Sequence, residues 1–296
     1  MDLIVISAEE ALAKNGSKYA KIKVLTSQKE SKTLFIWSPS VTIKAGNKYS
    51  VDDEQIANKN GSLSVSYGYL RPVTEDVAKL LEAIVPKPVS QTEWDEVIKQ
   101  LVFRFKTGTL KEAFLTAASD LYLKYAKYPA AISVHQTYKG GLLNHTFLAL
   151  KYLNGMMTAA SQNVRCEIAA TALLFHDYGK LHEYKEIPEG FETTPEYPLL
   201  GHIYISAQKV KDFLRGFNVS ESDNVFIQHC ILAHHGQLDW GSPVLPANFE
   251  AYLVHTADML SARDEQYELA AEDTRDRYLG TTIVHTDKTV QLYESI

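Results

Sequence analysis

The feature that most constrains this chain is an apolar, helix-like run, residues 173–175, that ends in a histidine and an aspartate side by side. His176 and Asp177 are consecutive, so on a helix their side chains project about 100° apart and cannot both face an apolar core without polar or metal partners. Lys180 follows within one turn. Because Mn²⁺, Fe²⁺, Co²⁺, Ni²⁺ and Zn²⁺ accept histidine and carboxylate ligands, the run predicts a metal site built on helices.

Two further ligand candidates lie in other helix-like apolar segments. His145 follows a Gly-Gly-Leu-Leu motif, and Asp258 lies late in the run that begins at residue 249. A lone histidine in such a segment is more often a core residue than a ligand. Together with His176 and Asp177, however, these side chains can close one metal site from three helices.

A second ion would need more nitrogen ligands near Asp177. His202 and one member of the pair His234-His235 are the candidates, and the sequence does not decide which of the pair ligates. Asp177 could then bridge the ions. Two ions roughly 3.5–4 Å apart can lower the pKa of a shared water and orient it towards a phosphorus atom. The pattern therefore predicts a hydrolase that acts on phosphodiesters.

Lys180 has two readings. Its ammonium group could neutralise a phosphoryl oxygen, or it could be a solvated cation that the dipole of the helix favours at the helix end. The sequence does not separate these roles, so we take Asp177 and Lys180 together as the catalytic candidates.

The first 72 residues differ in character from the rest of the chain. They contain short strand patterns separated by Asn-Gly and Ser-Pro turns, which predict a small OB-like β-barrel. After Thr74 the apolar residues follow helical spacing, and almost all of the remaining chain is expected to be helical. A long irregular loop is expected at residues 187–198 because of its prolines and glycine. The expected strands are residues 3–6, 19–26, 33–37, 48–51 and 62–67.

These patterns predict an α+β chain with two domains. An OB-like nucleic-acid-binding barrel is expected at residues 1–72 and a helical metal phosphohydrolase domain at residues 107–296, joined by a helical connector at residues 73–106.

The expected barrel is basic although the chain as a whole is acidic. Residues 1–72 hold nine Lys and one Arg against seven Asp and Glu, whereas the whole chain has a formal net charge of −6. Basic strands with interleaved aromatic rings form stacking platforms for single-stranded nucleic acid. Aromatic residues are also common in the cores of sheets, so each ring has a plain structural alternative. The substrate-binding candidates in this region are Lys21, Lys23, Phe35, Trp37 and Tyr67.

The composition, 45% hydrophobic and 22% charged, is that of an ordinary soluble globular protein. The sequence has no uninterrupted run of 18 apolar residues and no recognisable export signal, so we expect a cytoplasmic protein without a membrane partner. Cys166 and Cys230 are expected to be buried free thiols. The oligomeric state is left open, a homo-oligomer included.

The ordered set of His145, His176-Asp177 and Asp258 resembles the HD-domain superfamily of metal phosphohydrolases, and the added histidines resemble its two-metal branch. Further motifs narrow the resemblance to the YhaM-type 3′-5′ exoribonucleases, which place an OB-fold ahead of the HD domain. The motifs are Gly140-Gly141-Leu142-Leu143, His176-Asp177-x-Gly179-Lys180, Leu199 to Ile203, Ile231 to Gly236, and Gly241-Ser242-Pro243.

The resemblance implies an exonuclease that favours Mn²⁺ and removes nucleoside 5′-monophosphates from the 3′ end of single-stranded RNA, with DNA as a further substrate. Tyr138 and Ser242, in or next to these motifs, complete the substrate-binding candidates. Gln136, Asn144 and Tyr197-Pro198 depart from the family pattern near the approach to the metals, and they bear on substrate choice. The implied metal ligands are His145, His176, Asp177, His202, His234, Asp258 and, less definitely, His235.

Three alternatives remain at this stage. An HD-type phosphodiesterase could act on small or cyclic oligonucleotides, because fold does not fix substrate. A nucleic-acid-binding scaffold could retain the ligands without catalysis. A di-iron oxygenase could use a similar helical scaffold, although Lys180 and a basic barrel give that reading no support.

Overall fold

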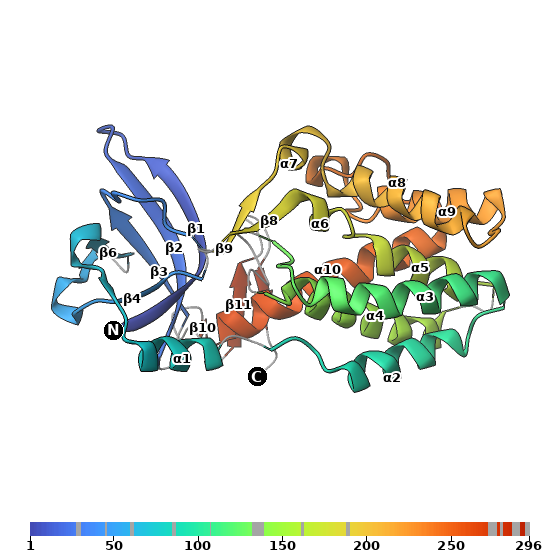
Figure 1. The fold of residues 1–296 in the computed structure, drawn as a ribbon, viewed down its shortest axis with the longest axis horizontal. Helices are drawn as coiled ribbons and strands as arrows, with labels where there is room; N and C mark the ends of the chain where they lie inside the picture. Colours follow the sequence, from blue (N-terminus) through green and yellow to red (C-terminus); the bar gives the residue numbers. More distant parts are fainter. Residues whose placement is uncertain are drawn as a thin grey trace.

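The computed structural model places a β-sheet at one end of the molecule and a bundle of helices at the other (Figure 1). The first 72 residues form the sheet, and most of the rest of the chain forms the bundle. The structure describes residues 1–27, 31–44, 46–59, 62–84, 87–106, 108–131, 139–160, 163–187, 190–271, 277–278, 281–285 and 291–293.

The sheet has seven strands in the order β5-β6-β3-β2-β1-β4-β7. Neighbouring strands run antiparallel, except that β3 and β6 are parallel. The strands are β1 (Asp2–Leu12), β2 (Lys18–Thr26), β3 (Ser31–Trp37), β4 (Lys48–Ser50), β5 (Ala57–Lys59), β6 (Ser62–Ser66) and β7 (Arg71–Pro72).

All five expected strands are present, but the expected barrel is not confirmed. Among the described residues the sheet ends at β5 on one side and at β7 on the other, and no pairing closes it. The two strands that the sequence did not indicate, β5 and β7, have only three and two residues, too few to show an alternating pattern. The N-terminal region is therefore an open sheet.

Alternation along β2 gives the sheet one apolar face. Ala20, Ile22 and Val24 are fully buried, and they pack with Leu34 and Ile36 of β3 in one cluster. The intervening residues of β2, which include the two lysines, face the other side, as the period of two in a strand requires. This second face is the one relevant to ligands.

The helices α2 to α5 and α8 to α10 share one apolar core. The helix α2 begins at a capping box in which Ser90 and Glu93 bond each other's backbone N–H groups. Trp94 of α2 belongs to the shared core, and the domain boundary at residue 106 stays a prediction. The helices are α1 (Glu75–Ile84), α2 (Gln91–Val102), α3 (Gly108–Tyr125), α4 (Gly141–Ala159), α5 (Cys166–Phe175), α6 (Lys180–Glu183), α7 (Glu196–Leu199), α8 (His202–Arg215), α9 (Glu221–Leu232) and α10 (Phe249–Ala271).

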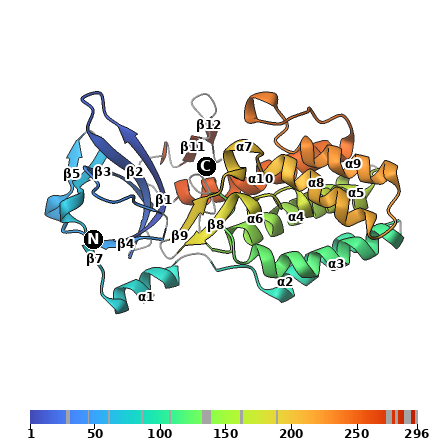
Figure 2. The same ribbon diagram turned by 45° about the horizontal axis from the view of Figure 1, so that its top comes forward.

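The prediction of an irregular loop at residues 187–198 was wrong. The strands β8 (Tyr184–Ile187) and β9 (Gly190–Thr193) form an antiparallel hairpin, and α7 follows directly. The sequence correctly indicated a turn in this region, but the segments on either side of the turn are paired strands. In both ribbon views this hairpin lies on the side of the helical bundle that faces the sheet (Figures 1 and 2). Near the C-terminus the described strands are β10 (Arg277–Tyr278), β11 (Thr281–His285) and β12 (Gln291–Tyr293).

Cys166 and Cys230 are buried free thiols, as predicted. Within the described ranges, no helix combines the length and apolar character needed to span a membrane.

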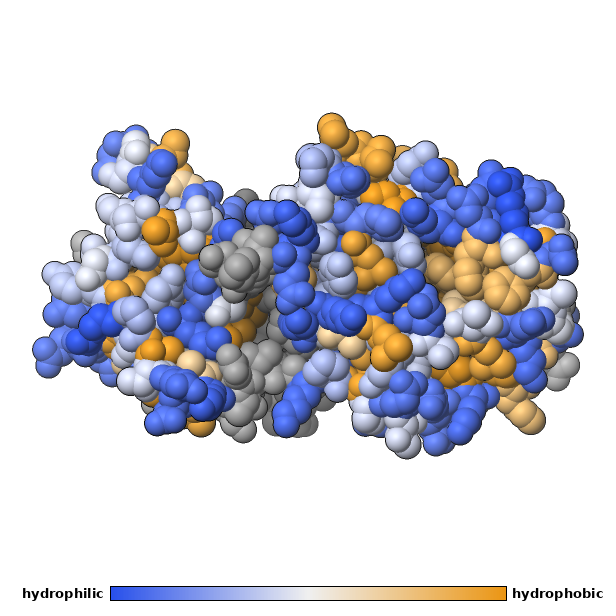
Figure 3. Space-filling model, in the orientation of Figure 1, coloured by the Kyte–Doolittle hydropathy of each residue, from blue (hydrophilic) through white to orange (hydrophobic). Residues whose placement is uncertain are grey.

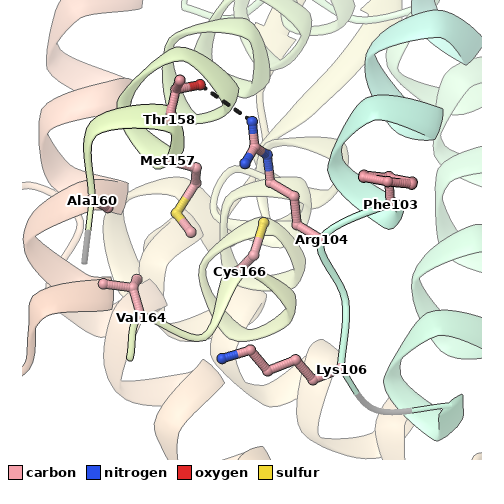
Figure 4. Close-up of a pocket in the computed structure, with 8 residues that line it drawn as sticks. All are labelled: Phe103, Arg104, Lys106, Met157, Thr158, Ala160, Val164 and Cys166. Carbon is pink, nitrogen blue, oxygen red and sulfur yellow. Dashed lines mark hydrogen bonds between the residues drawn. The ribbon is translucent and has the colours of Figure 1, made fainter. Parts of the chain in front are cut away.

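A surface pocket of about 490 Å³ lies where the ends of α2 and α4 meet the start of α5 (Figure 4). Arg104 lies on one side of it and donates a hydrogen bond of 3.2 Å to Thr158. Cys166, which lines the pocket, is the first residue of α5, whereas the His-Asp pair follows the last. The pocket is therefore at the opposite end of α5 from the predicted metal ligands.

The shared core makes a stability prediction. Phe114 of α3 is fully buried with its ring 5.0 Å from that of Phe105. Phe114→Ala should lower the free energy of unfolding by about 3–5 kcal/mol, because it leaves a cavity. The neighbouring Leu115 is 41% exposed, so Leu115→Ala should change the free energy of unfolding by about 0.5 kcal/mol at most. Urea unfolding followed by circular dichroism measures both, and equal losses would contradict this packing.

Candidate metal centre

All seven predicted ligands lie together, and five of them lie where a helix ends or begins. His176 and Asp177 come directly after α5, His202 is the first residue of α8, and the His234-His235 pair follows α9. His145 and Asp258 project from α4 and α10, which pack against each other. The ligands are therefore carried by five helices that belong to one core, and so their positions are fixed by packing.

The first group of ligand atoms is tight. The Nε2 atom of His145 lies 3.2 Å from Nε2 of His176 and 3.0 Å from Oδ1 of Asp258. His176 Nε2 is 3.5 Å from the same Asp258 oxygen. Ligands about 2.1 Å from one ion and at right angles to each other lie about 3 Å apart. The spacing of this group therefore fits a single cation.

His202, His234 and His235 form a second group, in which one ligand atom from each histidine lies within 4.8 Å of the others. Asp177 lies between the groups. Its Oδ2 atom is 3.3 Å from Nε2 of His176, and its Oδ1 atom is 3.5 Å from Nε2 of His202. The two oxygens of one carboxylate thus face different groups, as a bridging ligand requires.

Backbone carbonyls fix the tautomers of three of these histidines. The Nδ1 atoms of His176, His234 and His235 lie 2.6, 2.7 and 2.8 Å from the carbonyl oxygens of Leu173, Ile231 and Trp240. A carbonyl can only accept, so each Nδ1 carries the proton and each Nε2 presents a lone pair.

The ring of His145 has the same tautomer for a different reason. Ser261 donates its hydroxyl proton to the carbonyl of His145 at 2.9 Å, so at 3.0 Å its oxygen is left to accept from His145 Nδ1. The Nε2 atoms of His145 and His176 therefore meet lone pair to lone pair unless a proton or a cation lies between them.

This collection of acceptors fits a bound cation. In addition, Nε2 of His202 is buried and has no hydrogen-bond partner within the described part of the chain. A buried polar atom without a partner is costly, whereas an ion bound to this nitrogen would remove that cost. Two groups of three ligands, with Asp177 between them, are the residues that would hold divalent metal.

Lys180 is not the solvated helix-end cation that one reading predicted. It is only 8% exposed, and its Nζ atom donates a hydrogen bond of 2.7 Å to Oδ2 of Asp177. A buried lysine that is paired with a carboxylate keeps its charge inside the site.

The electrostatics of the centre differ between the two groups. Burial lowers the pKa of His176, but the neighbouring carboxylates outweigh burial and raise this pKa to about 10. Burial raises the pKa of Asp177, yet Lys180 and His176 hold it well below its usual range. Burial and the adjacent His235 hold the pKa of His234 well below its usual value. The pKa of His235 is lowered as well, chiefly by burial. His234 and His235 are therefore neutral and ready to ligate at neutral pH, whereas His176 holds a proton that a cation must displace.

Glycines allow the ligand-bearing segments to approach closely. A Cβ atom on Gly179 would lie 2.3 Å from the carbonyl oxygen of His202, and one on Gly236 would lie 2.3 Å from the ring of His255. Gly179 N–H also donates to the hydroxyl of Ser206 on α8 at 2.8 Å. His202 thus reaches Asp177 because position 179 has no side chain.

Sequence reasoning missed two supporting residues. Glu183 is 1% exposed, and its Oε2 atom lies 3.5 Å from Nδ1 of His202. Ser261 fixes the ring of His145, as described above. Both lie three residues after a candidate already named, Lys180 and Asp258, and that spacing on one helical face was the available signal.

The substrate-binding candidates on the sheet are partly brought together. Across β2 and β3, Lys21 pairs with Phe35 and Tyr19 pairs with Trp37. The ring of Tyr19 lies 5.9 Å from that of Phe35 and 5.2 Å from that of Trp37. Lys23 follows on the same face. These five residues, which we term the sheet platform, combine three aromatic rings with two lysines.

The other substrate-binding candidates lie elsewhere. Tyr67 packs against the core of the sheet and is not part of the platform cluster. The hydroxyl of Ser242 is directed at the carbonyls of Leu232 and Val244, at 3.1 and 2.9 Å, so it holds a turn and does not face a substrate. Tyr138 lies outside the described residues.

Of the departures from the family pattern, Asn144 faces away from the metal ligands. It accepts from the N–H of Val89 and donates to the carbonyl of Lys87, which anchors the segment before α2. The ring of Tyr197 packs on that of Tyr184 at 6.2 Å. Gln136 lies outside the described residues.

Metal binding at the first group should release a proton. The raised pKa of His176 means that this group binds a proton up to about pH 10, so the apparent affinity for the cation should rise with pH between roughly pH 6 and 9. Calorimetric titration of metal-free protein with Mn²⁺, in buffers of different ionisation enthalpy, counts the protons. An affinity independent of pH, without proton release, would contradict this assignment.

Gly179→Ala should displace the start of α8 and lower the metal content, because the new methyl group meets the backbone of His202. We expect a loss of about 1–3 kcal/mol in unfolding free energy as well. Gly155 of α4 is the matched control, since a Cβ there meets nothing within 4 Å. Gly155→Ala should keep the metal and leave stability unchanged or up to about 1 kcal/mol higher. Elemental analysis that finds equal metal in both variants would show the close contact to be unimportant.

Comparison with known proteins agrees with this geometry. Residues 142–263 match the family model for the HD domain. The curated protein named 3′-5′ exoribonuclease YhaM from Halalkalibacterium halodurans is 25% identical over 276 residues, which cover 91% of this chain and 84% of the relative. Its namesake from Bacillus subtilis is 24% identical over 275 residues, covering 91% and 86%. The one from Listeria welshimeri is 24% identical over 281 residues, covering 92% and 88%.

No solved structure gives a significant match to the chain. The region matched by the HD-domain model runs from three residues before His145 to five residues after Asp258, so it contains all seven ligand candidates. Residues 142–263 of the helical bundle therefore form an HD domain, and the chain is similar to the YhaM exoribonucleases over most of its length.

Proposed function

We propose that this chain is a metal-dependent 3′-5′ exonuclease that acts on single-stranded RNA, with single-stranded DNA as a further substrate, and releases nucleoside 5′-monophosphates. The observation that carries the proposal is the pair of ligand groups joined by Asp177. The direction of attack and the choice of RNA rest on the names of the relatives, which this chain matches from the sheet through the HD domain.

We infer that each ligand group holds one divalent ion, with Mn²⁺ the metal implied by the family resemblance. Bound cations supply Lewis acidity, which lowers the pKa of water and offsets the charge of phosphoryl oxygens. Two groups of three ligands leave coordination positions open for water and substrate. A structural metal site would instead be closed by its protein ligands.

The residues of this chain have separate parts in the proposed reaction. Four of the five ligand histidines hold their Nε2 lone pairs inward, because their Nδ1 atoms are fixed by carbonyls or by Ser261. Asp177 sets the spacing between the two groups. Lys180 keeps a positive charge beside that carboxylate, where it can donate to a phosphoryl oxygen.

The sheet platform supports a polymeric substrate over a small nucleotide. Three clustered rings offer stacking faces, and Lys21, which is exposed, offers a charge for the backbone. A small cyclic nucleotide would fill the metal centre alone and would have no use for a platform at the far end of the molecule (Figure 1). A cytoplasmic location and assembly into a homo-oligomer are both compatible with this function.

Incubation of the protein and Mn²⁺ with 5′-end-labelled single-stranded RNA should give a ladder that shortens from the 3′ end. Changing a residue that only supports a metal ligand lowers activity by up to about 100-fold. Because Asp177 is proposed to be a ligand itself, Asp177→Ala should lower the rate of hydrolysis by more than this. The fold should persist by circular dichroism. Asp212, on the outer face of α8 and 64% exposed, is the control, and Asp212→Ala should retain full activity. Internal cuts, or full turnover by Asp177→Ala, would contradict the proposal.

A second comparison separates the polymer from the small substrate. Trp37→Ala should weaken the hydrolysis of long RNA and leave that of bis(p-nitrophenyl) phosphate unchanged. Tyr69, which is 50% exposed in the short 3₁₀-helix between β6 and β7 and outside the platform, provides the control Tyr69→Ala. If Trp37→Ala degrades RNA at the rate of the unaltered protein, the small-nucleotide reading is favoured instead.

A further inference from the structure

Trp240 lies beside the metal centre, and much of its ring is exposed. The chain has three tryptophans. Trp94 is 1% exposed in the helical core, and Trp37, 37% exposed, belongs to the sheet platform. Trp240 is 43% exposed although its own carbonyl oxygen accepts from Nδ1 of the ligand His235. Trp240 therefore presents an exposed aromatic ring next to a metal ligand.

The turn that carries Trp240 is held in place by backbone and hydroxyl contacts. The N–H of Ser242 donates to the carbonyl of Gln237 at 3.1 Å, and that of Gly241 donates to Leu238 at 2.9 Å. The Ser242 hydroxyl then ties the turn to the end of α9. Gly241 has φ +85°, a conformation that favours glycine. The indole therefore projects from a fixed frame.

The indole of Trp240 packs against the ring of His255. The ring of His255 lies 6.2 Å from that of Trp240, and its own Nδ1 donates to the carbonyl of His234 at 2.8 Å. Because Gly236 has no side chain, the imidazole fits against the same turn. The indole thus rests on the metal-binding segment, and 43% of the residue remains open to solvent.

We propose that Trp240 stacks on the base of the 3′-terminal nucleotide and so positions the last phosphodiester at the metal ligands. The inference rests on the proposed exonuclease function and names the part of the substrate that this side of the site takes. Stacking suits an exonuclease that removes any nucleotide in turn, because every base has a π-face. The sheet platform, at the other end of the molecule, would take bases further upstream (Figure 1).

A docking site for an apolar protein segment is the competing use of this surface. Leu238 is 59% exposed on the same turn, and Leu199 of α7 is 77% exposed. Figure 3 shows hydrophobic side chains at the surface around α7. An aliphatic surface of this kind would depend on the leucines as much as on the indole, whereas base stacking depends on the aromatic ring alone. The two uses can therefore be separated by substitution.

The test measures binding, so it does not depend on hydrolysis. Fluorescence anisotropy is recorded for a labelled single-stranded oligoribonucleotide with Ca²⁺ in place of Mn²⁺. Three ligands are compared, one intact, one with an abasic 3′-terminal nucleotide and one with an abasic nucleotide near the 5′ end. The unaltered protein should bind the intact strand about tenfold more tightly than the strand with the abasic 3′ end.

Trp240→Ala should remove this preference, and Trp240→Phe should keep most of it. Both variants retain the backbone carbonyl that fixes His235, so their metal content should match that of the unaltered protein. Leu238→Ala controls for apolar surface on the same turn. Phe103→Ala controls for loss of an exposed ring, since Phe103 is 92% exposed at the distant pocket of Figure 4. Both controls should keep the preference.

The inference is overturned if the unaltered protein shows no preference for the 3′-terminal base, or if Trp240→Ala keeps it. Loss of the preference in Leu238→Ala to the same extent would assign the surface to apolar docking instead. Failure of the exonuclease function would appear separately, as an absence of RNA shortening in Mn²⁺ while the binding preference persists.

Discussion

The carboxylate of Asp177 is the constraint on which the rest of the centre depends. Its two oxygens face His176 on one side and His202 on the other, and Lys180 neutralises part of its charge. Five helices place acceptor atoms around it. Acceptors packed this closely repel each other unless a positive charge lies among them, so the fold of the HD domain and the binding of cations are thermodynamically linked.

The ligands could be predicted from the sequence because their chemistry conflicts with their surroundings. Consecutive histidine and aspartate after an apolar run have no stable place in a core without a cation. Glu183 and Ser261 carry no such conflict in the sequence, and their roles depend on how α6 and α10 pack. The same holds for Trp240, because a tryptophan after a ligand pair is equally compatible with burial. Its exposure is a property of the folded turn alone.

What the sequence can predict about the sheet is limited in a similar way. Alternation within β2 and β3 was readable because each strand has at least seven residues. Closure of a barrel depends instead on pairing between short edge strands, and β5 and β7 have too few residues to encode that pairing. The hairpin of β8 and β9 was mistaken for an irregular loop for a related reason. Proline and glycine indicate where a chain turns, but not whether the flanking segments pair.

Two of the ligand histidines are oriented in the same way by the helix that precedes them. His176 follows α5 and His234 follows α9, and each donates Nδ1–H to the carbonyl three residues before it, Leu173 or Ile231. The last carbonyls of a helix have no intrahelical partner, so they are free to accept. The bond fixes the tautomer, and the negative end of the helix dipole favours a cation at the same place. A histidine placed just after a helix is thereby oriented and lies where a cation is favoured, and each of the two ligand groups contains one such histidine, His176 or His234.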